Sequence, residues 1–275
     1  MLSWQQSAEV AGALAVAGAG LRFAPSPTAR KVAAFVFEAV VIAGLYTIWQ
    51  LAGEVSVLGP DDAAKRGAWI ARFEHGWLPS ERSVQNVVLG HPWIVQAENL
   101  YYATMHFGVL FLFLIWLFAR HRDRYRAVRT TMALTTLVCL VIQLVPVAPP
   151  RVLAGYVDTA AQYGQSVYNA GLSPDALAAM PSVHVAWAVL IAWYVMRISH
   201  SPWRWIAPLH AAITIFVVVS TGNHWWLDGI VAVIVLVVCA WIRVGLAAAR
   251  QHVRARWDTR RTTAPEPVNE PVTVQ

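Results

Sequence analysis

Two histidines and one aspartate stand where apolar stretches of this 275-residue chain begin. His184 follows a Pro-Ser pair in "AAMPSVHVAWAVL" (178–190), and His224 and Asp228 lie in "STGNHWWLDGI" (220–230). His224 and Asp228 have the i, i+4 spacing that places two side chains on one face of a helix. There the carboxylate can accept a hydrogen bond from one imidazole nitrogen, which leaves the other nitrogen to act as a nucleophile.

Neighbouring residues could handle the group that such a nucleophile attacks. His184 could protonate a leaving oxygen, and Arg151 could hold a phosphate through two parallel hydrogen bonds. Ser182 adds a hydroxyl beside Pro181, which suits the first turn of a helix, and the unpaired N–H groups of that turn favour an anion. These residue types predict phosphoryl transfer through a phosphohistidine. No metal site and no cofactor are predicted, because the sequence shows no cluster of carboxylates.

The composition indicates the elements that position these residues. Hydrophobic residues make up 57% of the chain and charged residues 13%, whereas about a quarter of the residues in a soluble domain are charged. The predicted fold class is therefore all-α, a polytopic membrane bundle of about six transmembrane helices. The spans of sufficient length are 32–51, 100–119, 130–147, 183–198, 205–221 and 225–245.

Basic residues are distributed unevenly between the two ends of these spans. Sixteen of the 21 Lys and Arg residues fall on one side, and the positive-inside rule places that side, with both termini, in the cytoplasm. We expect an integral protein of the cell (plasma) membrane whose segments 52–99, 148–182 and 222–224 face outward. This loop pattern accounts for the net charge of +6, so the predicted partners are a lipid substrate and the bilayer, and no nucleic acid. The oligomeric state is not predicted.

A six-span path brings the polar residues to one place. The fourth span runs inward from Ser182 and His184, and the fifth span returns to the outward face just before Asn223 and His224. Arg151 lies just outside the end of the third span. Three polar segments are therefore predicted to meet at the outward end of the bundle. This convergence favours a functional site over the alternative that each histidine is a lone interfacial residue.

The chain divides into three parts. Residues 1–31 form an N-terminal segment in which the apolar stretch 8–21 is interpreted as a peripheral helix, with an extra span as the alternative. Residues 32–246 form the membrane domain. Residues 247–275 are Arg-rich and then polar with several prolines, and we expect a disordered cytoplasmic tail.

One cluster in the second span has two interpretations. Glu98, Tyr102 and His106 recur every four residues near the outer end and share a helical face. They could bind a headgroup or an acceptor, or they could form a polar stripe packed between helices.

Three short motifs resemble those of the type 2 phosphatidic acid phosphatase superfamily. "PSVH" (181–184) resembles its PSGH-type motif, and "GNHWWLDG" (222–229) resembles its third motif with the core His-x-x-x-Asp. "APPRVL" (148–153) resembles its Arg-Pro first motif in reduced form. The likeness is closer to the branch that contains inositol phosphorylceramide synthases, and it covers roughly residues 95–245.

The resemblance implies a role for each matching residue in a six-helix membrane bundle with an outward-facing site. His224 would be the nucleophile that takes the phosphoryl group, and Asp228 would orient it. His184 would be the acid for the leaving group and then the base for the acceptor. Arg151 and Ser182, with backbone amides, would hold the phosphate.

Two cationic residues of the family pattern are missing from this sequence. The superfamily has a Lys upstream of its first-motif Arg, where this chain has apolar residues and Pro, and an Arg at the position of Val218. Asn223 could replace one cation as a neutral donor. A loss of cations suits a phosphodiester, which carries less charge than a monoester. The resemblance therefore implies a lipid phosphatase or phosphotransferase acting on a phospholipid, lipid phosphate or polyprenyl phosphate, with phosphoinositol transfer as the alternative.

Two other classes of protein are more distant alternatives. Paired histidines on adjacent spans can ligate haem, but Asp228 and Arg151 near His224 favour an anion site, and a purified sample without a Soret band would remove this idea. A transporter or a non-enzymatic scaffold is the other alternative. The sequence shows no inverted repeat of the kind found in transporters, and labelled phosphate on a histidine would exclude a purely structural role.

Overall fold

The computed structural model describes residues 3–54, 60–164 and 177–262. The described residues form helices and no strand. The helices are α1 (Trp4–Phe23), α2 (Pro27–Glu54), α3 (Pro60–Glu74), α4 (Glu81–Leu89), α5 (Pro92–Arg120), α6 (Arg122–Gln143), η1 (Pro150–Val152), α7 (Thr159–Tyr163), α8 (Val183–Ile198), η3 (Pro202–Trp205), α9 (Ile206–Ser220) and α10 (Trp226–Thr262). The protein is the all-α polytopic bundle that the sequence predicts.

Each predicted span coincides with a helix. Among the described residues, five helices are long and apolar enough to cross a membrane: Pro27–Ile48, Pro92–Arg120, Arg122–Gln143, Pro202–Ser220 and Trp226–His252. The sixth, α8, is equally apolar but has 16 residues. A helix of that length rises about 24 Å, less than the roughly 30 Å of a hydrocarbon core. These long apolar helices make the chain an integral membrane protein.

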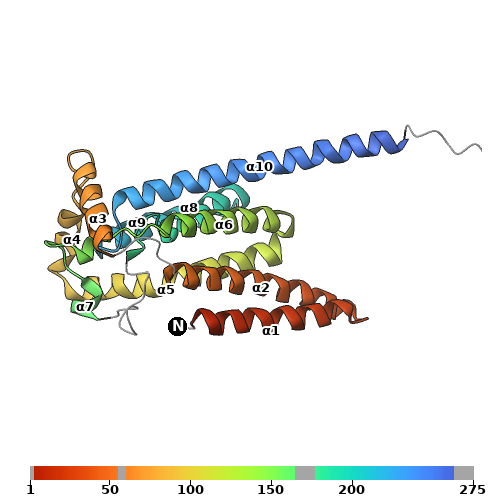
Figure 1. Ribbon diagram of the computed structural model, residues 1–275, viewed down its shortest axis with the longest axis horizontal. Coiled ribbons are helices and arrows are strands. Elements are labelled where there is room, and N and C mark those ends of the chain that lie inside the picture. The colour runs from red at the N-terminus through yellow and green to blue at the C-terminus, as the bar shows by residue number, and fades with distance from the viewer. Residues whose placement is uncertain (1–2, 55–59, 165–176, 263–275) are drawn as a thin grey trace, which may run out of the picture.

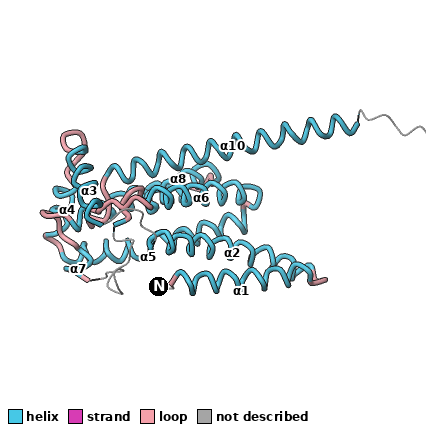
Figure 2. The backbone as a smooth tube through the Cα atoms, viewed as in Figure 1, coloured by secondary structure: helices cyan, strands magenta, loops and turns pink. Residues whose placement is uncertain are grey.

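The axes of the long helices are roughly parallel, and the short helices gather at one end of the bundle (Figure 1). We call this end the rim: α8 and α10 begin here, and α3, α4 and α7 cover it. At the opposite end the chain turns tightly between α5 and α6 and between α8 and α9 (Figure 2). Beyond those turns α10 continues, and α1 and α2 also extend past them (Figure 1). The rim is therefore where loops and helix starts, with their unpaired backbone groups, come together.

Two Arg-rich segments are helical in the structure. The Arg-rich segment 120–129 is not a loop, since His121 alone separates α5 from α6. The predicted disorder from residue 247 is wrong over its first part, because α10 continues to Thr262. Both segments are rich in Arg, which favours a helix more than most polar residues do. Residues 263–275 lie outside the described part of the chain.

The N-terminal helix packs along the bundle. The side chain of Ser3 caps α1 by accepting a hydrogen bond from the Gln6 amide, while Gln6 bonds back to the Ser3 amide. α1 then runs antiparallel along α2 over most of its length (Figure 1). Its predicted position at the membrane surface stays a prediction.

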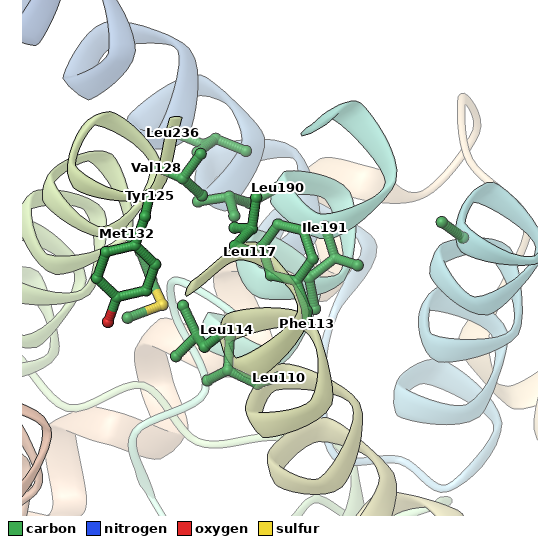
Figure 3. Packing of buried hydrophobic residues seen from close by; sticks show 11 residues of the cluster. Leu110, Phe113, Leu114, Leu117, Tyr125, Val128, Met132, Leu190, Ile191 and Leu236 are labelled. Carbon is green, nitrogen blue, oxygen red and sulfur yellow. The ribbon is translucent and has the colours of Figure 1, made fainter. Parts of the chain in front are cut away.

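A buried apolar cluster joins α5, α6 and α8 (Figure 3). Leu117, Val128 and Leu190 are almost completely buried in it. Truncation of such a side chain to Ala typically lowers the free energy of unfolding by about 2–5 kcal/mol. This packing fixes α5 and α8 relative to each other, and these two helices carry Tyr102, His106 and His184 toward the rim.

Candidate active site

The His224–Asp228 pair lies at the start of α10. The imidazole Nδ1 of His224 is 3.2 Å from Asp228 Oδ2 and 2.7 Å from the carbonyl oxygen of Ala179. Both neighbours are hydrogen-bond acceptors, so Nδ1 carries the proton and donates to them. The other ring nitrogen, Nε2, is then unprotonated in the neutral ring and has a lone pair for attack. Asp228 is completely buried and also accepts the Trp225 amide at 2.8 Å.

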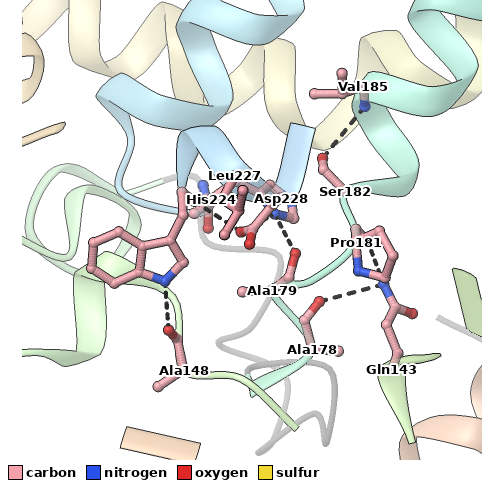
Figure 4. Close-up of polar contacts among 12 residues, drawn as sticks. Gln143, Ala148, Ala178, Ala179, Pro181, Ser182, Val185, His224, Leu227 and Asp228 are labelled. Atoms are coloured by element: carbon pink, nitrogen blue, oxygen red, sulfur yellow. Dashed lines mark hydrogen bonds and ion pairs between the residues drawn. The ribbon is translucent and has the colours of Figure 1, made fainter. Parts of the chain in front are cut away.

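The segment before α8 is bound to the same helix start. The Ser182 amide donates to the Asp228 carbonyl oxygen at 3.1 Å, and the Trp225 indole donates to Ala148 at 2.9 Å. Figure 4 shows Ala148, Ser182 and Asp228 around this helix start, together with the Ala179 carbonyl that receives His224. Three chain segments that are distant in the sequence therefore hold one histidine in place. Ala179 was not predicted as a site residue, because a backbone carbonyl has no sequence signal.

Ser182 begins α8 differently from the prediction. Pro181 precedes the helix, joined to Met180 by a cis peptide bond, and Ser182 is the N-cap residue. Its hydroxyl oxygen accepts the Val185 amide at 3.4 Å. The amides of Val183 and His184 have no partner within α8, because they belong to its first turn. The predicted anion-favouring helix start is thus present, and the hydroxyl of Ser182 caps it.

Arg151 is held at the rim by the turn that precedes His224. Its guanidinium donates to the side-chain oxygen of Asn223, and its amide donates to the carbonyl oxygen of Gly222 at 2.9 Å. Gly222 has φ of 70°, and a Cβ there would lie 3.1 Å from the Gln85 side-chain nitrogen. The turn therefore requires glycine. In the structure Asn223 holds Arg151, and its own NH₂ group donates to Thr221.

His184 is positioned by aromatic rings. Its ring centroid is 4.5 Å from that of Tyr102 in a stacked arrangement, and 4.3 Å from that of His106. The centroid of the His224 ring is 5.6 Å away. The predicted cluster on α5 is therefore split: Tyr102 and His106 face His184, whereas Glu98 accepts the Ser220 hydroxyl at 3.0 Å. Tyr102 and His106 contact a site residue, and Glu98 joins two helices.

A buried carboxyl group from α3 supports the start of α10. Glu74 is 2% exposed, and it accepts the Leu227 amide, one residue before Asp228. Burial raises the pKa of Glu74 to about 9, and the adjacent Glu81 carboxyl contributes in the same direction. Glu74 is thus protonated at neutral pH. The sequence did not identify it, because its contact joins residues far apart in the chain.

An apolar cavity of about 700 Å³ opens among these residues. Arg151, His184, Asn223 and His224 line its rim end. From there it continues between α2, α5, α6 and α8 past largely apolar side chains. Asp228 lies behind His224, outside the lining. A phosphate at the rim end could therefore contact both histidines and the arginine, with an apolar group extending into the bundle.

Among the described residues, the cavity lining has one cationic side chain, and no metal site is arranged in this region. Of the described side chains that line the cavity, Arg151 is the only Lys or Arg. Val218, at the position of a family arginine, is buried, and its carbonyl oxygen accepts the amides of Asn223 and His224. In the described part of the chain, no three His, Cys, Asp or Glu side chains are grouped to bind a metal ion.

One of three comparisons with known proteins identifies a family. A family model described as the PAP2 superfamily matches residues 68–242. Comparisons with curated proteins and with solved structures each gave no match. The closer likeness to inositol phosphorylceramide synthases stays a prediction. Because the family match spans more than half of the chain and includes all six predicted site residues, the protein belongs to the PAP2 superfamily and is a phosphatase-type phosphoesterase.

Proposed function

We propose that this protein cleaves a lipid phosphate ester in the membrane through a covalent phosphohistidine on His224. The observation that carries the proposal is the bonding of the His224 ring. Its Nδ1 is committed to Ala179 and Asp228, while the ring lines a cavity together with His184 and Arg151. Family membership supports phosphoester chemistry over the haem-binding and transporter alternatives.

The first step transfers the phosphoryl group to the protein. The lone pair on His224 Nε2 attacks phosphorus, a P–N bond forms, and the P–O bond to the leaving oxygen breaks. Protonated His184 gives its proton to that oxygen, so the lipid leaves as an alcohol or a lower phosphate. Asp228 stabilises the positive charge that develops on the His224 ring, and Arg151 holds the phosphoryl oxygens.

The second step releases the phosphoryl group. His184, now neutral, takes a proton from water, and the water oxygen attacks phosphorus. A P–O bond forms, the P–N bond breaks, and the electron pair returns to His224 Nε2. Phosphate leaves and His184 is again protonated, so the cycle closes without a cofactor.

The cavity supports a lipid as the substrate. Its rim end is polar and the rest of its lining is largely apolar, which suits a phosphate headgroup with a long hydrocarbon chain. A phospholipid, a lipid phosphate and a polyprenyl phosphate all have this form. Because basic residues concentrate at the opposite end of the bundle, we place the rim on the extracytoplasmic side of the plasma membrane, with cytoplasmic termini.

Transfer of a phosphorylated headgroup, as in phosphoinositol transfer, is the second candidate. It is favoured by the single cationic side chain, Arg151, among the described residues that line the cavity. A phosphodiester carries one negative charge where a monoester carries up to two, so one arginine balances it better. In that reaction the acceptor is an alcohol hydroxyl, which takes the place of water in the second step.

The test is product analysis on a panel of lipid phosphates and diphosphates in liposomes, with and without inositol. Wild type is run beside His224→Ala and beside His200→Ala, a substitution at the opposite end of the bundle. We expect phosphate release by wild type and His200→Ala, and none above background by His224→Ala. Inositol phosphate formed only when inositol is present would instead show transfer of the phosphoryl group to an alcohol and support a transferase. Equal products from all three proteins would contradict the proposal.

A further inference from the structure

The cavity extends far from the histidines along one helix. The α5 side chains that line it recur at helical spacing from Tyr102 to Phe118. With a rise of 1.5 Å per residue, this stretch of α5 is about 24 Å long, most of the roughly 30 Å thickness of a hydrocarbon core. On α2, which runs antiparallel to α5, the lining side chains run from Tyr46 to Phe35. The cavity thus leads from the rim toward the opposite end of the bundle.

Three aromatic rings line the cavity at that end. Phe118 makes edge contacts with Phe35, at 6.1 Å between centroids, and with Tyr125, at 5.2 Å. The guanidinium of Arg122 lies 4.3 Å from the centroid of the Phe118 ring. All three aromatic side chains are part of the cavity lining. We call Phe35, Phe118 and Tyr125 the floor.

A polar pair adjoins the floor. Arg129 of α6 forms an ion pair with Glu38 of α2, and the Tyr125 hydroxyl donates to Glu38 at 3.1 Å. The side chains of Arg129 and Glu38 are 22% and 16% exposed. Charged groups held inside a membrane bundle are costly to separate or to cover with hydrocarbon. An apolar chain that descends from the rim would therefore gain nothing by passing the floor.

We propose that the floor and the Glu38–Arg129 pair limit the length of the apolar chain that the site accepts. The occupant is a single hydrocarbon chain of a lipid phosphate whose phosphate lies at His224. The inference rests on the proposed function, which fixes the headgroup at the rim end. It adds a second fixed point, so that the distance between the histidines and the floor selects the substrate by chain length. Chains that end at the floor bury every methylene, and longer chains must bend or leave methylenes outside.

Two substitutions change this distance in opposite directions. Phe118→Ala removes part of the floor and lengthens the site, while Ala39→Phe adds a ring about one turn of α2 above Phe35 and shortens it. Phe216→Ala is the matched control, because Phe216 is exposed on α9 and is not part of the lining. The substrates are a homologous series of single-chain alkyl monophosphates in mixed micelles.

We expect the optimum of kcat/KM to move to longer chains in Phe118→Ala and to shorter chains in Ala39→Phe. Each methylene that is newly accommodated should raise kcat/KM by up to about fourfold. The change should occur in KM, since the reacting groups are untouched, and the shortest substrates should react as in wild type. Phe216→Ala should keep the wild-type optimum.

Failure of this inference is distinguishable from failure of the proposed function. If the variants hydrolyse the series with the wild-type optimum, the chain-length inference is wrong and the proposed function stands. If wild type hydrolyses no member, the proposed function fails, and binding of the matching non-hydrolysable alkyl phosphonates decides. If the chain length that binds most tightly shifts in the two variants, the floor still limits chain length. If it does not shift, the chain-length inference is overturned.

Discussion

At the scale of single residues, the tautomer of His224 is the central feature. Two acceptors share its Nδ1 proton, the Ala179 carbonyl at 2.7 Å and the Asp228 carboxylate at 3.2 Å. The shorter contact is to a backbone group that no substitution removes. Orientation of the ring and stabilisation of its charge are therefore divided between two groups, and they can be tested separately.

Asp228→Asn should lower kcat by about 10²–10³-fold, within the range of a lost acid–base or charge-stabilising group. The Ala179 carbonyl still fixes the tautomer, but the negative charge that stabilises the phosphorylated ring is gone. Steady-state kinetics on the best substrate of the panel measures the effect. The control is Asp123→Asn, an exposed carboxylate at the opposite end of the bundle, which should retain wild-type kcat. An Asp228→Asn protein as active as this control would contradict the role of Asp228.

Arg151→Lys should lower kcat/KM by about 10–100-fold. Lysine keeps the charge but loses the planar fork that can bond to Asn223 and to a phosphate at the same time. The loss should be largest for monoesters, because they carry the most charge. Arg72→Lys, at an exposed position on α3, serves as the comparison. If both variants show wild-type kcat/KM for every substrate, Arg151 does not bind the phosphate.

At the scale of elements, the start of α10 depends on α3. Glu74 accepts the Leu227 amide, which would otherwise have no partner in the first turn of α10. Its carboxyl is protonated in the folded state up to a pKa of about 9, because it is buried beside Glu81. Ionisation there would place negative charge next to Asp228. The bundle should therefore lose stability as the pH rises.

The direction follows from proton linkage. Between the ordinary pKa of 4.5 and the folded value of about 9, the folded protein retains a proton on Glu74 that the unfolded chain has lost. The contribution of this group is thus most favourable below pH 4.5, and it decreases across the interval. Glu74→Gln keeps an acceptor for Leu227 and cannot ionise, so its Tm should fall less between pH 5 and pH 9 than that of wild type.

Thermal unfolding in detergent across this pH range measures the difference. Glu9→Gln, at an exposed position on α1, should follow wild type. Parallel curves for wild type and Glu74→Gln would show that Glu74 is ionised in the folded state.

The sequence predicts the helices better than the contacts between them. Long apolar runs identify six helices, five of which are long enough to cross a bilayer, because a bilayer requires length and low charge. The Arg-rich corner at 120–129 and the extension of α10 were not predicted, since local charge looks the same in a loop and in an exposed helix. The bond from Glu74 to Leu227 links positions 153 residues apart, and no local pattern indicates such a pair.

At the scale of the whole molecule, the alternating direction of successive spans predicts that the site residues lie at the same end of the bundle. His184, His224 and Arg151 line one end of one cavity, as the alternation of span direction requires. The motifs point to these residues because each lies where an apolar run begins or ends. The cavity itself could not be predicted, because its volume depends on how α2 packs against α5 and α6.

The orientation in the membrane gives a prediction for the intact cell. Ser83 on α4 covers the rim, and Ser201 lies between α8 and α9 at the opposite end; both are exposed. A membrane-impermeant maleimide should label Ser83→Cys in intact cells and label Ser201→Cys only after the cells are opened. The native Cys139 and Cys239 are buried, so the background is low. The reverse pattern would place the site on the cytoplasmic side.

The account depends most on covalent catalysis by His224. The direct measurement is rapid quenching of the reaction with a phosphorus-labelled lipid phosphate, followed by mapping of the label on the protein. We predict label on His224 that turns over in wild type and is absent from His224→Ala. Label on another residue, or turnover by His224→Ala at the wild-type rate, would contradict the account.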